Sequence, residues 1–175
     1  SDGGLVDYTC SWSFTYFDAG NSIGAGMYDK DVDVILAAAG VVGVGAINEA
    51  KTRAESGEDV YVIGVDVDQY DEGLMQDGSS VMLTSAMKYL GQAAYEQIEA
   101  HVNGEFDGGR VVMMDINANG VGLPKENPNL SNKTTDIVNQ VVWSIQDGAI
   151  EIPSTKEDLL LFLDELNQDF GDLNY

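Results

Sequence analysis

Residues 32–69 read VDVILAAAGVVGVGAINEAKTRAESGEDVYVIGVDVDQ, and this stretch decides the fold. Residues 32–37 and 60–65 form two short apolar runs, a pattern typical of strands that are buried on both faces. Between them, apolar residues recur at the spacing of one helix face, after a turn that carries Gly40, Gly43 and Gly45. The stretch therefore predicts a strand, a glycine turn, a helix and a second strand.

The two predicted strands end beside polar or glycine positions. Gly40 follows the first strand and Asp66 follows the second. In an open α/β sheet, ligands bind outside the carboxyl ends of the strands. We therefore expect Gly40 and Asp66 to lie on one rim of the sheet and to belong to a binding site.

The remaining sequence continues the alternation of strands and helices. Apolar runs predict further strands at residues 5–8, 81–85 and 110–115. Helical spacing predicts helices at residues 17–28, 86–101 and 134–146, and a last helix through Phe170. Ser154 and Glu157 form a capping-box pattern before that helix, and residues 117–131 read as an irregular loop. The order predicts an α/β layer fold with a mainly parallel sheet.

Composition limits the possible partners. The chain has 175 residues, of which 44% are hydrophobic, and its net charge is −22, from 30 acidic and 8 basic residues. Such a surface repels nucleic acid, so we expect no nucleic-acid partner. No apolar stretch has the length of a membrane span. The single cysteine, Cys10, cannot form an internal disulfide, and we interpret it as a packing residue at a strand end.

The glycine turn has two interpretations. Gly43 and Gly45 begin like a dinucleotide-binding fingerprint, and Asp66 follows about 20 positions later, where a carboxylate would bind a ribose. Asn48, however, stands where the third glycine should be. The alternative is that the glycines allow tight packing of the helix on the strand. A nucleotide-dependent enzyme therefore remains a rival hypothesis.

Two acidic segments resemble metal loops only in part. The cluster that follows Asp66 has Tyr70 and Asp71 at the wrong places for a calcium loop. Residues 115–126 match the calcium-loop expression in full, but they follow a predicted strand, and Pro124 and Pro128 block an exiting helix. A calcium loop of another kind stays open as an alternative, and we treat the match as chance. We predict no metal site and no cofactor. His101 has no serine or cysteine nearby in the sequence, so no hydrolytic triad is predicted.

Five ordered blocks resemble the basic membrane protein family. They are VDVILAAAGVVGVGAINEAK, VIGVDVDQ, VMLTSAMK, GEFDGG and NANGVGLP, and the resemblance runs from about residue 6 to residue 152. The family comprises the substrate-binding lipoproteins of nucleoside ABC importers, related to the purine nucleoside receptor of that type. It implies a type I periplasmic-binding-protein fold, in which two α/β/α lobes close on a ligand, and a non-enzymatic role.

The resemblance also implies the site. The glycine turn, the aspartate of the GVD block and the lysine of the LTS block line the cleft and hold the ribose, and these positions are Gly40, Gly43, Asp66 and Lys88. Trp12, in the loop after the first predicted strand, is a candidate for stacking on the base. The implied partners are a nucleoside, an ABC transporter permease and an N-terminal lobe. The implied location is the outer face of the cell membrane, through a lipid anchor, or the periplasm.

The chain lacks the first half of the family pattern. We therefore expect residues 1–152 to form the second lobe, as a fragment of a larger receptor or as a single-lobe version. The predicted helix at residues 86–101 would pack on the first lobe, and residues 153–175 would form a C-terminal amphipathic helix and tail. A ligand-sensing domain of a receptor is a third possibility, because it shares the fold and differs in its partner.

Overall fold

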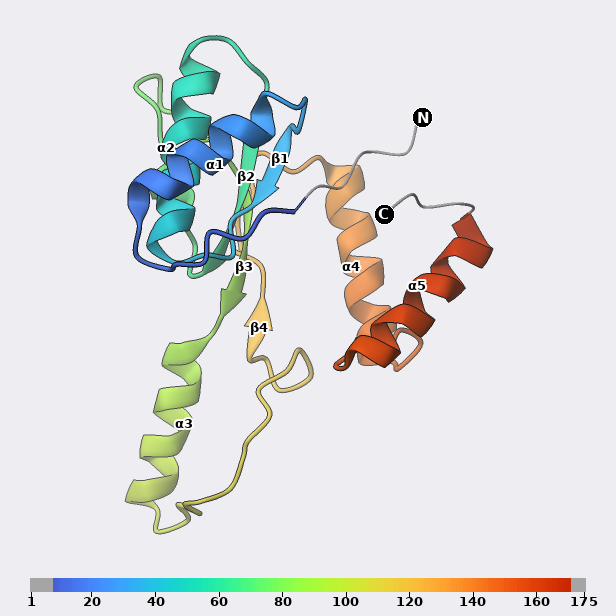
Figure 1. Ribbon diagram of the computed structural model, residues 1–175. Helices are drawn as coiled ribbons and strands as arrows, with labels where there is room; N and C mark the ends of the chain where they lie inside the picture. The colour runs from blue at the N-terminus through green and yellow to red at the C-terminus, as the bar shows by residue number, and fades with distance from the viewer. Residues whose placement is uncertain (1–7, 171–175) are drawn as a thin grey trace.

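A mainly parallel sheet is the centre of the structure, a computed structural model that describes residues 8–170. The strands are β1 (Val34–Leu36), β2 (Tyr61–Asp66), β3 (Met82–Lys88) and β4 (Val121–Gly122). The helices are α1 (Phe17–Tyr28), α2 (Val41–Glu55), the 3-10 helix η1 (Tyr70–Gly73), α3 (Leu90–Val102), α4 (Asn132–Gln146) and α5 (Lys156–Phe170). Figure 1 shows α1 and α2 packed together beside this sheet.

The sheet has the order β1-β2-β3-β4. The first three strands are parallel, with Val34 paired to Tyr61 and Asp66 paired to Met87, and β4 runs antiparallel to the end of β3. Because β1, β2 and β3 are parallel neighbours, their carboxyl ends lie on one rim. The predicted α/β class with a mainly parallel sheet is confirmed.

Glycines set the contact between α1 and α2. A Cβ at Gly20 would collide with the carbonyl of Val42, and one at Gly45 would collide with the carbonyl of Phe17. Only glycine lets the two helix backbones approach so closely. Gly20, which lowers the intrinsic helix propensity of α1, is therefore what allows this helix to pack closely on α2.

Arg53 of α2 links the same two helices through ion pairs. Its guanidinium donates to Asp29 Oδ1 of the α1 C-terminal turn at 2.6 Å and to Glu49 Oε1 at 2.9 Å. It also lies over the ring of Tyr28, 6.0 Å from the centroid. The hydrophobic core lies between these helices and the sheet, and its fully buried members include Ile47, Val62, Val81 and Met82.

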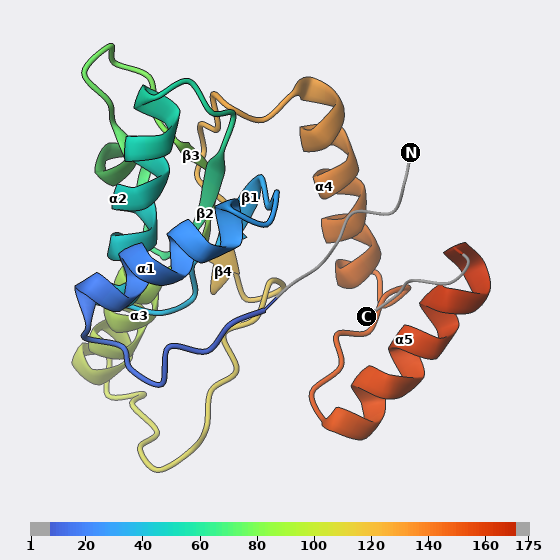
Figure 2. The ribbon, with the colours of Figure 1, turned by 45° about the horizontal axis from the view of Figure 1, so that its top comes forward.

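Helices α3, α4 and α5 extend away from this core. Figures 1 and 2 show α3 projecting beyond the end of β3, and α4 and α5 standing to one side of the sheet. Neither α3 nor α4 has a buried residue. Within the described residues, no helix combines the length and the apolar character needed to cross a bilayer.

The predicted boundaries differ from the structure in the middle of the chain. The helix predicted at residues 86–101 begins at Leu90, because β3 continues to Lys88. The strand predicted at residues 110–115 is wrong: this run is irregular and exposed, with Val111 92% exposed. The partner of the β3 end is instead β4, within the segment predicted to be an irregular loop. Strand pairing, which is non-local, overrides apolar character here.

Two smaller predictions near the chain ends are also wrong. Cys10 is exposed rather than packed at a strand end. Before α5, the hydroxyl of Thr155 accepts from the Asp158 amide at 3.1 Å, so the side-chain cap lies one residue after the predicted Ser154. The strand predicted at residues 5–8 falls almost entirely outside the described residues.

Candidate functional site

The carboxyl ends of β2 and β3 bring two of the predicted site residues into contact. Asp66 is the last residue of β2 and Lys88 is the last residue of β3. The Lys88 Nζ lies 2.8 Å from Asp66 Oδ1, and the side chains are 60% and 49% exposed, respectively. The ion pair is therefore open to a ligand. Lys88 ends a strand, whereas the predicted helix at residues 86–101 had placed it in a first helical turn.

The backbone around Asp66 is held by a residue that the sequence analysis missed. Asp66 has a φ of 71°, in the left-handed region that non-glycine residues rarely adopt. The Gln69 side-chain oxygen accepts from the Val65 amide at 2.9 Å, and the Gln69 amide donates to the Ser85 hydroxyl at 3.1 Å. Ser85 is 1% exposed. Gln69 thus fixes the turn that carries Asp66. The sequence feature that could have identified it is a side-chain amide shortly after the end of a predicted strand.

Gly64 makes this arrangement possible. A Cβ at Gly64 would come within 2.7 Å of Gln69 Oε1 and 2.8 Å of the Ser85 hydroxyl oxygen. Both are too close for a carbon atom, so a side chain at this position would displace the hydrogen bonds that hold the turn. The GVD block therefore supplies the carboxylate of Asp66 and also, at Gly64, the space that the Gln69 side chain needs.

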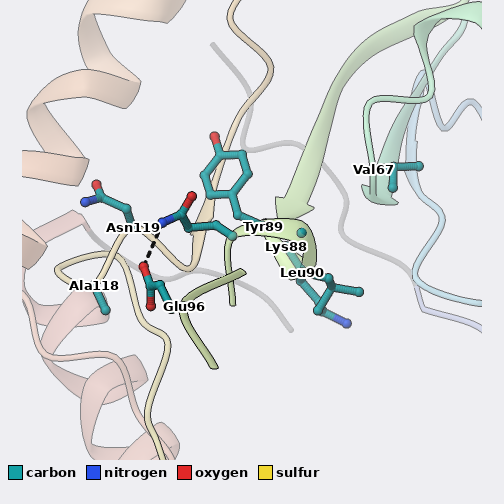
Figure 3. Close-up of a pocket in the computed structure, with 9 residues that line it drawn as sticks. Val67, Lys88, Tyr89, Leu90, Glu96, Ala118 and Asn119 are labelled. Atoms are coloured by element: carbon teal, nitrogen blue, oxygen red, sulfur yellow. Dashed lines mark hydrogen bonds between the residues drawn. The ribbon is translucent and has the colours of Figure 1, made fainter. Parts of the chain in front are cut away.

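A hollow of about 610 Å³ lies beside the Lys88 end of the pair. Figure 3 shows that its walls come from three segments: Val67 after β2, the β3–α3 junction with Tyr89, and the turn with Asn119. Gln92 donates to Glu96 Oε1 at 2.8 Å on the α3 side. The lining mixes polar groups with apolar ones, as is usual for small-molecule sites.

The two glycines of the turn have different surroundings. Gly40 precedes α2 with a φ of 57° and is exposed, one strand away from Asp66 on the same rim. The amide of Val41 donates to the Phe14 carbonyl at 2.9 Å, so this donor of the helix start is already used. Gly43 is buried, and a Cβ there would lie 2.7 Å from the Ala37 carbonyl oxygen. The geometry at Gly43 favours the packing interpretation.

Trp12 lies apart from the ion pair. Its side chain is 93% exposed, and it borders a second hollow, which is formed by residues 8–14, β1 and the helices rather than by the β2 and β3 ends. The Phe14 carbonyl that bonds Val41 nevertheless holds this segment next to Gly40. The structure thus pairs Asp66 with Lys88, places Gly40 one strand away, and puts Trp12 and Gly43 on the β1 side.

The loop that matches the calcium expression uses its first acid internally. Asp115 Oδ1 accepts from the amides of Asn117 at 2.9 Å and of Ala118 at 3.0 Å. Within residues 8–170, no three histidine, cysteine or acidic side chains are grouped as metal ligands.

Comparison with known protein families gives one match over most of the chain. Residues 6–156 match the model of a family described as "ABC transporter substrate-binding protein PnrA-like". The chain is 34% identical over 154 residues to a CD4+ T-cell-stimulating antigen of Listeria monocytogenes, covering 85% of this chain and 43% of that protein. It is also 34% identical, over 156 residues, to the ABC transporter nucleoside-binding protein BmpA of Lactococcus lactis, covering 85% and 44%. The chain therefore spans less than half the length of these relatives.

Solved structures support the fold. A solute-binding protein of an ABC transporter system from Aeropyrum pernix superposes with a TM-score of 0.73 at 22% identity, over 95% of this chain and 53% of that one. A transcriptional activator of the comK gene from Bacillus halodurans superposes with a TM-score of 0.63 at 17% identity, over 76% and 43%. At these identities the likeness concerns the fold alone.

Proposed function

The chain belongs to the PnrA-like family of ABC transporter substrate-binding proteins, and from that premise we propose that it forms one lobe of a receptor that binds a nucleoside, with a purine base, between two lobes. The family consists of binding proteins and not of enzymes, so the hypothesis of a nucleotide-dependent enzyme is set aside. The printed name of the Lactococcus relative, a nucleoside-binding protein, supports the choice of ligand.

The observation that carries the proposal is the exposed Asp66–Lys88 pair on the rim. Lys88 uses Asp66 Oδ1, which leaves Oδ2 to accept from a ligand. The vicinal hydroxyls of a ribose are two adjacent donors that also accept, so a carboxylate and an ammonium group side by side suit them. Hydrogen bonds to charged groups are roughly twice as strong as neutral ones, and the turn held by Gln69 keeps the carboxylate in place.

The other proposed site residues are two glycines, which act through the backbone, and Trp12, which acts through its aromatic ring. Gly40 lets the chain approach the ligand closely, since it carries no side chain at the rim. Gly43 acts indirectly, by seating α2 against Ala37. Trp12 supplies an exposed indole on the segment that Phe14 anchors beside Gly40, and such a ring stacks on a nucleobase. These three residues would lie on the β1 side of the ligand, with Asp66 and Lys88 on the β3 side.

The remaining partners follow from the length of the relatives. A single lobe leaves the rim open, whereas a closed site buries most of the surface of its ligand. We therefore propose that a second lobe closes on this rim, and that the complete receptor delivers the nucleoside to an ABC permease. Its location would be the outer face of the membrane, held by a lipid anchor, or the periplasm.

The experiment is a ligand panel against a protein that joins this chain to an N-terminal lobe. Purine and pyrimidine nucleosides, free ribose and an amino acid are compared by melting temperature and by calorimetry. A nucleoside at 100 times its Kd should stabilise the protein by about 2.7 kcal/mol. Stabilisation by a sugar or an amino acid, with none by any nucleoside, would contradict the proposal.

Charge-matched variants locate the site. Asp66→Asn and Lys88→Met should each weaken nucleoside binding by about 1–3 kcal/mol, because each leaves a desolvated partner unsatisfied. Asp71→Asn makes the same charge change in the exposed first turn of η1 and should leave the affinity unchanged. Equal losses in Asp66→Asn and Asp71→Asn would mean that only the overall charge matters.

A further inference from the structure

The strand β3 reaches one residue further than its parallel neighbour. Asp66, the last residue of β2, pairs with Met87, whereas Lys88 pairs with Val121 of β4. β4 has two residues and runs antiparallel to β3. The backbone that carries the Lys88 ammonium is therefore held in the sheet from the β4 side, and whatever fixes β4 also fixes the lysine of the ion pair.

Tyr89 binds the chain on both sides of β4. Its amide donates to the Gly120 carbonyl, just before β4, at 2.9 Å. Its phenolic hydroxyl donates to the Leu123 carbonyl, just after β4, at 3.1 Å. Between these two bonds the ring covers Gly122, where an added Cβ would lie 2.7 Å from the Tyr89 hydroxyl oxygen and 3.1 Å from Cε2. We call these four residues the Tyr89 clamp.

The segment that contains β4 is itself anchored at both ends. Gly120 is buried, and its amide donates to the Asp115 carbonyl at 2.8 Å. The loop that matches the calcium expression thus serves as the turn that supports β4. On the other side, Asn127 accepts from the Thr84 hydroxyl of β3 at 2.6 Å and donates to the Pro124 carbonyl at 2.7 Å. The Tyr89 clamp is therefore attached to a fixed segment.

The two residues at the end of β3 have different partners. The Lys88 side chain meets Asp66, whereas Tyr89 meets the β4 segment, and in Figure 3 the Tyr89 ring and the Lys88 side chain extend in different directions. The helix α3 begins directly afterwards, at Leu90, and makes no extensive contact with another described helix or strand. Among the described elements, β4 is thus the support of this end of β3.

We propose that Tyr89 is a positioning residue for Lys88: its hydrogen bond to the Leu123 carbonyl holds the end of β3 where the ammonium group meets Asp66 and the ligand. Tyr89 borders the same hollow as Lys88, but its hydroxyl proton is already donated to Leu123. It therefore acts on the ligand through Lys88 and not by direct contact. The step from the clamp to the ligand rests on the proposed function, in which the ion pair binds a ribose.

The test removes a single hydroxyl group. Tyr89→Phe keeps the ring on Gly122 and loses the bond to Leu123. Tyr95→Phe is the matched control, because the Tyr95 hydroxyl donates to Glu99 Oε1 on α3 at 3.1 Å, outside the clamp. In the protein that joins this chain to an N-terminal lobe, Tyr89→Phe should weaken binding of the tightest-binding nucleoside by about 2- to 10-fold, the range for one neutral hydrogen bond. Tyr95→Phe should leave the Kd unchanged.

A double-mutant cycle separates positioning from other roles. In the Lys88→Met background, Tyr89→Phe should cause no further loss of affinity, because the side chain that it positions is gone. Gly122→Ala, whose Cβ displaces the Tyr89 hydroxyl, should behave in the same way. An equal loss from Tyr89→Phe in both backgrounds would mean that Tyr89 touches the ligand or supports the lobe in general, and it would overturn the proposal. So would an unchanged Kd in Tyr89→Phe alone.

A measurement on the chain alone distinguishes failure of this inference from failure of the proposed function. The NMR signal of the Asp66 carboxyl carbon at neutral pH reports the nearby ammonium group. Lys88→Met should shift this signal, Tyr89→Phe should shift it less and in the same direction, and Tyr95→Phe should not shift it. If no nucleoside binds but the signal behaves in this way, the proposed function fails and the positioning role stands. A signal that either Lys88→Met or Tyr89→Phe leaves unchanged would overturn the positioning role, whatever the ligand.

Discussion

The region of residues 17–88 and the region of residues 90–170 differ in what their apolar faces touch. The buried members of the hydrophobic core cluster all lie in the first region, from Tyr28 to Met82. In the second region no described apolar side chain of the helices is buried, and several are exposed, such as Ile98 of α3 at 64% and Trp143 of α4 at 60%. Both regions have amphipathic helices, but among the described side chains only the first region contains the surfaces that cover them.

The difference shows that helical periodicity predicts a helix but not its partner. Most helical stability in proteins comes from packing an apolar face rather than from intrinsic propensity. In α2 that face meets β2 and α1 within the chain. In α3 and α4 it has no equivalent cover among the described residues, as the proposed two-lobed receptor leads us to expect.

The strongest test of this difference between the two regions is to truncate one isoleucine side chain in each of them. Ile47 of α2 is 1% exposed and Ile98 of α3 is 64% exposed. Ile47→Ala should lower the free energy of unfolding by about 2–5 kcal/mol, because it leaves a cavity in the core. Ile98→Ala should change it by less than about 0.5 kcal/mol. Urea unfolding of the chain measures both.

The outcome for Ile98→Ala is the informative one. A loss close to that of Ile47→Ala would show that α3 packs within the chain, and the two regions would then not differ. In a protein that also contains the N-terminal lobe, a new cost for Ile98→Ala would identify α3 as part of the contact between the lobes.

A second pair of variants tests how closely α1 packs on α2 in the first region. Gly20 lies against the Val42 carbonyl, whereas a Cβ at Gly26 of the same helix would meet nothing within 4 Å. Gly20→Ala should destabilise the chain by about 1–3 kcal/mol through overpacking. Gly26→Ala should stabilise it by roughly 0.5–1 kcal/mol, since alanine favours the helix. Thermal unfolding at one pH compares them; stabilisation by both would mean that α1 does not contact α2 closely.

Local patterns predicted the first region well. The apolar runs and the glycine turn gave β1, α2 and β2 in order, and the spacing of apolar residues gave α1 with the bounds that the structure has. The role of Gly20 could not be predicted, because its contact with Val42 joins residues that lie far apart in the sequence. The same limit explains the false strand at residues 110–115: an apolar run needs a paired neighbour, and pairing is not visible in one sequence.

For the candidate site, strand ends indicated Asp66 and Gly40, and the family resemblance added Lys88; a ligand-binding role for these residues stays a prediction. The parallel order of β2 and β3 brings Lys88 next to Asp66, as their ion pair shows. Gln69 was missed because its role depends on Ser85, a buried hydroxyl of the next strand. The positions of Trp12 and Gly43 depend on how residues 8–14 and α2 pack, which periodicity does not specify.

Alkaline pH should weaken the first region through Tyr28. Burial raises the pKa of Tyr28, the nearby Glu49 carboxylate adds to this, and Arg53 opposes it. The neutral phenol is thus favoured in the folded state. Stability is complete below the unfolded tyrosine pKa of about 10, and it falls above that pH, where the unfolded state ionises first. Stability measured from pH 8 to 11 should show this loss.

Tyr28→Phe separates the two contributions of that side chain. At neutral pH it should cost about 1 kcal/mol, because the Tyr28 hydroxyl donates to the Tyr61 carbonyl at 3.1 Å. Above pH 10 the variant should lose less stability than the parent. A residual slope is expected from Tyr61, whose pKa is also raised by burial and by Asp59. An unchanged slope would contradict the assignment to Tyr28.

A small effect on stability is expected at the Asp66–Lys88 pair, at the carboxyl ends of β2 and β3. Lys88→Met should change the free energy of unfolding by less than about 1 kcal/mol, since exposed ion pairs contribute little. Arg53→Met, which removes contacts with Asp29, Glu49 and Tyr28, should destabilise the chain more. Unfolding in low and high salt compares the two variants. A large loss in Lys88→Met would make the pair part of the packing of the fold, and the rim would then have no charge reserved for a ligand.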